Sequence, residues 1–280
     1  MSLLTPRKPL RRICATISAA VAIWASAAVT LAAPAAATQP ARPPPGWRPD
    51  IAAARRYAVA RPGVVAFAVR TEARFWGFRE DRVYPSASVL KAMLLAAYLR
   101  HARSRPLRAG ERALLAPMIR RSDNTAATRI RDRLGNAALV RLARAAHMTA
   151  FKPAAVWGLS RITARDQTRF FLHLRALLPP RHRAYGLRLM RSIVPSQRWG
   201  IGRLRLPGWR VYFKGGWGSG SGAVDNQVAL LTRGDIRLSA AVLTASNGSH
   251  ATGKATLGGV FRRLLRGLLT AGHQDLLWLR

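Results

Sequence analysis

The chain is poor in two kinds of residue, cysteines and acids. Cys14 is its single cysteine, so an intramolecular disulfide framework is excluded. Cys14 also lies in a leader that we expect to be removed, which leaves the mature protein without thiol chemistry. Asp and Glu together number 11, against 47 Lys and Arg, and the formal net charge is +36 at pH 7. A basic surplus on this scale raises the question of an anionic partner.

Nucleic-acid binding is one interpretation of this surplus, but the pattern favours another. The basic residues are spread along the whole chain, without zinc-ligand spacing, an RNA-binding aromatic signature or a basic helix with heptads. The six histidines are also scattered, so we predict no metal site and no cofactor. Since net charge governs non-specific association and not fold, we favour an enzyme that works near an anionic cell envelope, with no specific nucleic-acid partner.

The first 37 residues have the layout of a secretory signal peptide. Four basic residues lie among the first 12, an apolar run follows over residues 13–33, and small residues occupy 35–37. We predict cleavage after Ala37. An uncleaved anchor is the alternative, because the run approaches the roughly 20 residues that span a bilayer. Either way the remainder is expected to be secreted or to lie in the periplasm or cell envelope.

Residues 38–49 contain five prolines and predict a stiff, extended linker. The folded domain is then expected over residues 50–280, beginning with Asp50 as a helix N-cap. The expected elements are helices over about 50–60, 88–102, 180–189 and 255–269, a mostly helical stretch over 107–176 with breaks at Gly135 and 152–158, and strands over 64–70, 74–79, 209–214, 223–232 and 236–244.

This order predicts an α/β (α+β) fold in two lobes. Strands from both ends of the domain, about residues 50–85 and 208–280, would form one five-stranded antiparallel sheet flanked by helices. Residues 86–207 would form an all-helical lobe.

The stretch over residues 84–98 (YPSASVLKAMLLAAY) is the first of three polar clusters. Apolar residues recur at helical spacing from Ser88 onward, so Ser88 lies at or near a helix N-terminus, where unpaired N–H groups favour negative charge. Lys91 follows three residues later and projects from the same face. A serine hydroxyl becomes nucleophilic when a neighbouring base takes its proton, and a desolvated lysine can be that base. The alternative is an N-cap serine followed by a surface lysine, because short motifs recur by chance.

The second cluster, Ser-Asp-Asn-Thr-Ala-Ala over residues 122–127, begins 34 positions after Ser88 and opens a predicted helix. Alone it indicates an N-cap and a turn. The third cluster, Phe-Lys-Gly-Gly-Trp over residues 213–217, lies at the end of a predicted strand, and a glycine-rich turn is expected over 215–222. Two glycines there let another backbone approach the strand. Alone it indicates an ordinary strand-to-loop exit.

In this order the three clusters resemble the S-x-x-K, S-D-N and K-T-G motifs of class A β-lactamases and penicillin-binding proteins. The resemblance covers about residue 50 to the C-terminus and implies the β-lactamase/transpeptidase-like fold. It implies that Ser88 is the acylated nucleophile, that Lys91 is its base and that Ser122 passes a proton to the leaving nitrogen. The backbone N–H groups of Ser88 and Trp217 would form the oxyanion hole. Substrate-binding roles are implied for Asn124, Lys214, Gly216, Trp217 and Ser219.

Crowding of basic and hydroxyl groups should lower the pKa of Lys91, as a general base requires. Gly215 departs from the family pattern, which has a hydroxyl there that helps to hold the substrate carboxylate. Ser219 and Ser221 are candidates for that role, with a flexible Gly-Ser linker as the alternative. Trp199 is interpreted as a core residue.

Two further departures concern the walls of the cleft. Class A β-lactamases carry a glutamate that activates the deacylating water, but residues 148–162 contain no Glu or Asp. Asp166 lies just beyond and is interpreted as a first-turn helix charge. The segment between the Ser88 helix and Ser122 is also short, which predicts a missing hairpin and a more open cleft.

We therefore expect a monomeric, secreted serine hydrolase that forms an acyl-enzyme on Ser88 and hydrolyses β-lactams inefficiently. One alternative is a D-alanyl-D-alanine peptidase that acts on cell-wall peptides. Another is a non-catalytic module that binds anionic cell-envelope polymers through its basic surface.

Overall fold

The computed structural model of the chain describes residues 47–218 and 223–269. The predicted signal peptide, most of the predicted linker, Ser219 and Ser221 lie outside these residues. The strands are β1 (Val64–Thr71), β2 (Phe75–Phe78), β3 (Tyr84–Pro85), β4 (Arg161–Ile162), β5 (Arg210–Gly218), β6 (Val224–Arg233) and β7 (Ile236–Ala245). The α-helices are α1 (Ile51–Val59), α2 (Leu90–His101), α3 (Ala109–Arg120), α4 (Asn124–Ala145), α5 (Ala164–Leu172), α6 (Leu174–Leu177), α7 (Pro180–Arg191), α8 (His250–Leu264) and α9 (Arg266–Leu269). Short 3-10 turns are η1 (Ala87–Val89), η2 (Trp157–Leu159), η3 (Pro195–Gln197) and η4 (Gly200–Arg203).

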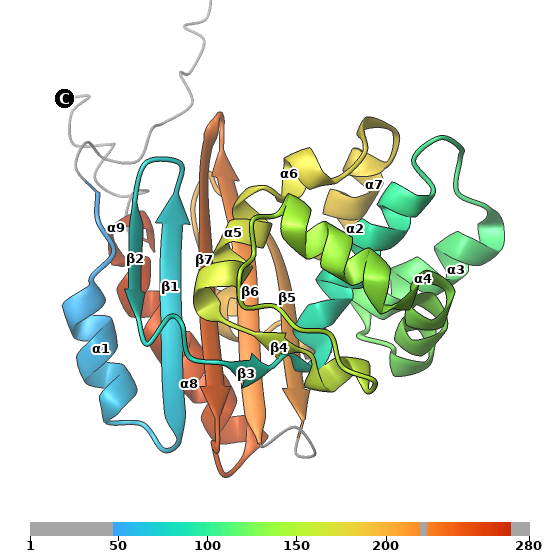
Figure 1. Cartoon of the computed structure of the whole chain (residues 1–280). Coiled ribbons are helices and arrows are strands. Elements are labelled where there is room, and N and C mark those ends of the chain that lie inside the picture. Colours follow the sequence, from blue (N-terminus) through green and yellow to red (C-terminus); the bar gives the residue numbers. More distant parts are fainter. Residues whose placement is uncertain (1–46, 219–222, 270–280) are drawn as a thin grey trace, which may run out of the picture. The chain divides into compact units, whose positions relative to one another are not determined.

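Five antiparallel strands form the main sheet in the order β2-β1-β7-β6-β5. β1 pairs with β7 along its whole length, from Val64 opposite Ala245 to Thr71 opposite Leu238, so the two ends of the domain meet in one sheet. In Figure 1, α1 and α8 cover one face of the sheet and α5 covers the other, while α2, α3, α4 and α7 gather beyond β5. The expected five-stranded sheet with flanking helices and a helical lobe is confirmed.

The helix α2 is the centre of the helical lobe. Its residues from Leu90 to Leu99 are all buried, and it packs against α3, α4 and α7. A helix that is buried on every side has to be mostly apolar, which explains why leucine, alanine and methionine fill most of its circumference, with Lys91 as a buried exception. The helical spacing of the apolar residues predicted burial on one face, whereas the helix is buried on every face.

Two boundaries and one pair of strands differ from the prediction. β5 continues through Gly215 to Gly218, where a turn was expected, because β6 pairs with it as far as Gly218. α8 begins at His250 and not near residue 255, since the Ser249 hydroxyl caps it by accepting from the N–H of Thr252 (3.1 Å). The short pair β3–β4 was not predicted. Gly135 does interrupt α4, with a φ of +67°. None of the helices in the two described ranges is long and apolar enough to cross a membrane.

Candidate active site

Ser88 lies in the 3-10 turn η1, immediately before α2. The preceding residue, Ala87, has a φ of +43°, a left-handed conformation that is unfavourable for a residue with a Cβ. Such a conformation persists only where its surroundings impose it. One restraint is Asn226 of β6, which donates from Nδ2 to the backbone oxygen of Pro85 (2.8 Å). The sheet thus fixes the chain that presents Ser88, whose side chain is partly exposed.

The amine of Lys91 is buried and surrounded by oxygens of the second cluster. Nζ donates to the backbone oxygen of Ser122, to Ser122 Oγ (3.1 Å) and to Asn124 Oδ1 (2.7 Å). Burial lowers the pKa of Lys91 to about 7, and the carboxylate of Asp123 opposes this shift. The direction agrees with the prediction, but the main cause is desolvation and not crowding by other cations. An amine with such a pKa is partly neutral near pH 7, so it can accept a proton.

A second lysine reaches the same hydroxyl from β5. Lys214 Nζ donates to Ser122 Oγ (3.0 Å) and to the backbone oxygen of Gly215 (2.6 Å). Burial, and then the nearby Lys91, hold the pKa of Lys214 well below its usual value. A hydroxyl has two lone pairs and one proton. Because two amines donate to Ser122 Oγ, its own proton is left for a third partner, such as a leaving nitrogen.

The backbone of β5 passes directly beside Ser88, the predicted nucleophile. A Cβ added to Gly216 would collide with the backbone nitrogens of Ser88 and Val89, so only glycine permits this approach. Trp217 follows Gly216 in β5. Trp217, the second predicted oxyanion-hole residue, therefore lies one residue from the contact with Ser88.

An indole lies over the other side of Lys91. The ring centroid of Trp157 is 5.0 Å from Lys91 Nζ, and Trp157 Nε1 donates to Thr128 Oγ1 (3.1 Å). The next residue, Gly158, faces the nucleophile turn, since a Cβ added there would lie 3.9 Å from the Cα of Ala87. Neither residue was predicted from the sequence to belong to the site. Their only signal was their position in the loop that lacks a carboxylate.

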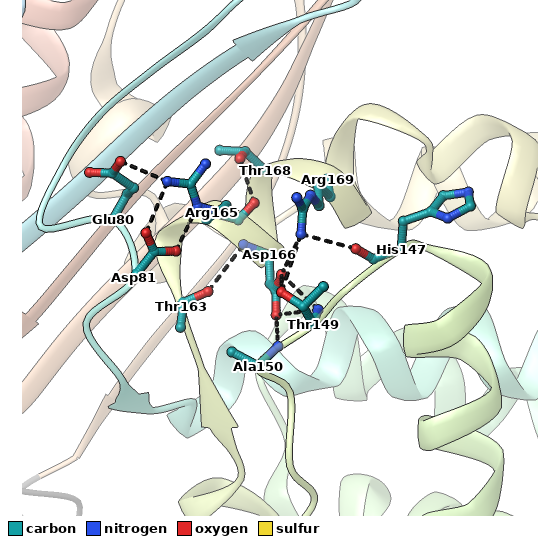
Figure 2. Close-up of polar contacts among 10 residues, drawn as sticks. All are labelled: Glu80, Asp81, His147, Thr149, Ala150, Thr163, Arg165, Asp166, Thr168 and Arg169. Carbon is teal, nitrogen blue, oxygen red and sulfur yellow. Dashed lines mark hydrogen bonds and ion pairs between the residues drawn. The ribbon is translucent and has the colours of Figure 1, made fainter.

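The buried carboxylate of Asp166 anchors the start of this loop (Figure 2). It accepts from the backbone N–H groups of Thr149 (3.0 Å) and Ala150 (2.7 Å), and it pairs with Arg169 (3.3 Å). Asp166 lies in the first turn of α5, which Thr163 caps, as predicted. Its oxygens are already used by the loop, so they are not available to a water in the cleft.

The structure thus brings Lys91, Ser122, Asn124 and Lys214 into direct contact, with Ser88 and Gly216 beside them. Trp199 is buried, as predicted. The predicted substrate residue Ser219 lies outside the described residues.

Comparison with known proteins shows the family of the chain. Residues 107–267, more than half of the chain, match the model of the beta-lactamase enzyme family. The chain belongs to this family. The matched residues include Ser122, Asn124 and Lys214 but begin after Ser88 and Lys91, so the assignment of those two rests on the motif and the geometry.

Solved structures of class A β-lactamases share the beta-lactamase fold of the chain. A class A β-lactamase from Mycobacterium abscessus has a TM-score of 0.67 and 17% identity, covering 78% of this chain and 98% of its own. A β-lactamase from Sphaerobacter thermophilus has a TM-score of 0.65 and 22% identity, covering 78% and 97%. An ancestral class A β-lactamase has a TM-score of 0.64 and 19% identity, covering 76% and 97%. No curated protein matches the chain.

Proposed function

We propose that the chain is an exported serine hydrolase that forms an acyl-enzyme on Ser88 and reacts with β-lactams as class A β-lactamases do, but releases the product slowly. The observation that carries this proposal is the buried amine of Lys91, which has a pKa of about 7 and contacts Ser122, the hydroxyl that Lys214 also contacts.

Acylation follows from these groups. Neutral Lys91 takes the proton of Ser88, and the oxygen of Ser88 bonds to the carbonyl carbon of the substrate. The charge that develops on the carbonyl oxygen is met by the N–H groups of Ser88 and Trp217. When the C–N bond breaks, Ser122 gives its proton to the leaving nitrogen and recovers one from Lys91. Protons and charge balance, since Lys91 ends neutral and Ser88 carries the acyl group.

Deacylation needs a base that activates water, and in class A β-lactamases this base is a glutamate. The loop over residues 148–162 contains no Glu or Asp. Trp157 and Gly158 face the cleft where a carboxylate is expected by the family resemblance. The indole also covers one side of Lys91, which limits the approach of water to that amine. We therefore expect the acyl-enzyme to persist.

The same feature favours a second candidate, a D-alanyl-D-alanine peptidase that acts on cell-wall peptides. Its acylation step is identical, and a long-lived β-lactam adduct is the expected result of offering it a penicillin. A non-catalytic module that binds anionic envelope polymers is the third candidate. The intact contacts among Lys91, Ser122 and Lys214 argue against it, because an inactive module has no need of two buried amines.

Intact-protein mass spectrometry tests these candidates. The purified protein is followed over time with benzylpenicillin and with a peptide ending in D-Ala-D-Ala, and Ser88→Ala is the control. We expect a lasting penicilloyl adduct that is absent from Ser88→Ala. Rapid loss of the antibiotic without an adduct would contradict slow deacylation, cleavage of the peptide would favour the peptidase, and no reaction with either compound would contradict the enzymatic proposal.

A further inference from the structure

Three aromatic rings lie together at the C-terminal end of β5, which we call its outer end. The rings of Trp217 and His250 are stacked, with centroids 4.4 Å apart and an interplanar angle of 20°. The ring of Trp199 meets His250 edge-on, at 5.6 Å and 87°. Trp217 is 50% exposed, whereas Trp199 is buried. Stacking on His250 covers one face of the Trp217 indole, and the exposed area leaves room for a second ring to stack.

A buried carboxylate fixes the middle ring. His250 Nδ1 lies 2.5 Å from Asp225 Oδ1, and Asn247 Nδ2 donates to Asp225 Oδ2 (3.1 Å). Asp225 lies opposite Trp217 in the pairing of β5 with β6. Burial raises the pKa of Asp225, and the hydrogen bond from His250 opposes this shift. The charge of Lys254, which lies one turn after His250 in α8, also opposes the rise in the pKa of Asp225. The imidazole therefore has one orientation, and the stacked indole of Trp217 is held with it.

Trp199 fills the space where the family motif has a hydroxyl. A Cβ added to Gly215 would lie 2.6 Å from the Trp199 ring, so no larger residue fits while the indole is in place. Gln227 holds this segment, because its Nε2 donates to the backbone oxygen of Trp199 (2.8 Å) and its Oε1 accepts from the N–H of Ile201 (2.7 Å). The indole of Trp199 thus occupies the space that a side chain at Gly215 would need. Trp199, His250 and Trp217 together form an aromatic wall at this end of β5.

This wall adjoins the reacting groups. Trp217 directly follows Gly216, whose backbone touches that of Ser88. A substrate whose carbonyl oxygen sits between Ser88 and Trp217 extends along the outer end of β5, and its neighbouring group meets the exposed indole. A carboxylate in that position would lie against the apolar ring of Trp217.

We propose that the outer end of β5 is a substrate subsite for an uncharged ring, in which Trp217 stacks on the ring, and His250 and Asp225 position Trp217. This inference rests on the proposed function and deepens it: among the amides that acylate Ser88, those with a neutral ring beside the scissile bond are preferred over those with a carboxylate there.

Equilibrium binding to Ser88→Ala tests the subsite without the need for acylation. Ligand-observed NMR compares the carboxamide of benzylpenicillin, a neutral probe, with benzylpenicillin itself. We expect the carboxamide to bind more tightly, and Trp217→Ala, made in the same background, to weaken its binding roughly fivefold. Trp76→Ala, on β2 at the opposite edge of the sheet, is the matched control and should have no effect. Tighter binding of the acid, or binding of neither compound, would overturn the subsite.

A second variant rebuilds the family motif. Trp199→Ala together with Gly215→Thr should shift the ratio of the two affinities towards the acid by about tenfold, since a hydroxyl then occupies the freed space. An unchanged ratio would show that Trp199 does not set the preference. A preference for the acid that His250→Gln abolishes would assign the imidazole to a carboxylate and overturn the neutral ring. Failure of the proposed function has a different signature, because binding to Ser88→Ala would persist while the protein with Ser88 forms no adduct.

Discussion

At the scale of residues, the contacts of Lys91 decide what the site can do. Its amine is buried among oxygens of Ser122 and Asn124, and its pKa is about 7. Above this pH the amine is mainly neutral and can take the proton of Ser88, whereas below it the amine is mainly charged. The rate of acylation should therefore rise with pH.

We expect the rate of adduct formation on Ser88, measured by mass spectrometry, to increase between about pH 5 and pH 9 with a midpoint near 7. Lys91→Arg should be at least about 100-fold slower and lose this pH dependence, because a guanidinium stays protonated. Lys152→Arg, which changes an exposed lysine, serves as the control. A flat profile in the unaltered protein would assign the proton transfer to another group.

Gly158 offers a direct test of why the acyl-enzyme should persist. Its missing side chain points towards Ala87, with the nearest atom 3.9 Å from an added Cβ, and its φ is not left-handed. Gly158→Glu should place a carboxylate beside the nucleophile and shorten the lifetime of the adduct by about 100-fold, a typical effect of a general base. The lifetime is measured by mass spectrometry after excess penicillin is removed. Gly158→Gln, of similar size, should leave it unchanged, and equal effects of the two variants would point to loop disruption.

The residues of the three motifs could be identified from the sequence, but the residues that pack around them in the folded protein could not. Ser88, Lys91, Ser122, Asn124 and Lys214 stand out because their spacing along the chain is itself a pattern. Trp157 and His250 stand out only after folding, since a single tryptophan or histidine has no spacing that distinguishes a site residue from a core residue.

At the scale of elements, strand and helix ends were harder to predict than the elements themselves. β5 was expected to stop at Gly215 because glycine weakens a strand, yet pairing with β6 carries it on to Gly218. α8 was expected to begin near residue 255 because its apolar pattern is clearest there, yet Ser249 caps it earlier. In both cases an interacting group sets the boundary. For β5 it is the neighbouring strand β6, and for α8 it is the side chain of Ser249.

The loop over residues 148–163 has an anchor that can be tested at this scale. Figure 2 shows Asp166 receiving N–H groups from Thr149 and Ala150 while Arg169 approaches its other side. Asp166→Asn would place an amide N–H₂ among donors, so we expect it to lower the free energy of unfolding by about 2 kcal/mol. Chemical denaturation measures this change.

The matched control is Asp81→Asn, which removes an exposed carboxylate from Arg165 in the neighbouring ion pair and should cost about 0.5 kcal/mol or less. If Asp166→Asn is as mild as Asp81→Asn, the loop does not depend on this anchor. If it also shortens the lifetime of the Ser88 adduct, the loop is the element that excludes water.

At the scale of the whole molecule, the sheet joins strands from the two ends of the domain. Most helices of the helical lobe lie between these strands in the sequence. This topology could be expected from the order of the elements, because strands at both ends need one another to bury their apolar faces. The net charge of +36 is a separate property of the whole chain, and it says nothing about the chemistry of Ser88.

Binding to anionic surfaces and acylation of Ser88 should therefore respond differently to salt. We propose that the basic surface attracts anionic polymers or lipids of a cell envelope, and we expect co-sedimentation with vesicles rich in anionic phospholipid that weakens strongly between about 50 mM and 500 mM salt, because salt screens exposed charges. Acylation should change little over this range, since the two lysines that contact Ser122, Lys91 and Lys214, are buried. Ser88→Ala should bind the vesicles as the unaltered protein does, and neutral vesicles are the control. Binding that resists salt, or that requires Ser88, would contradict an electrostatic attachment independent of the active site.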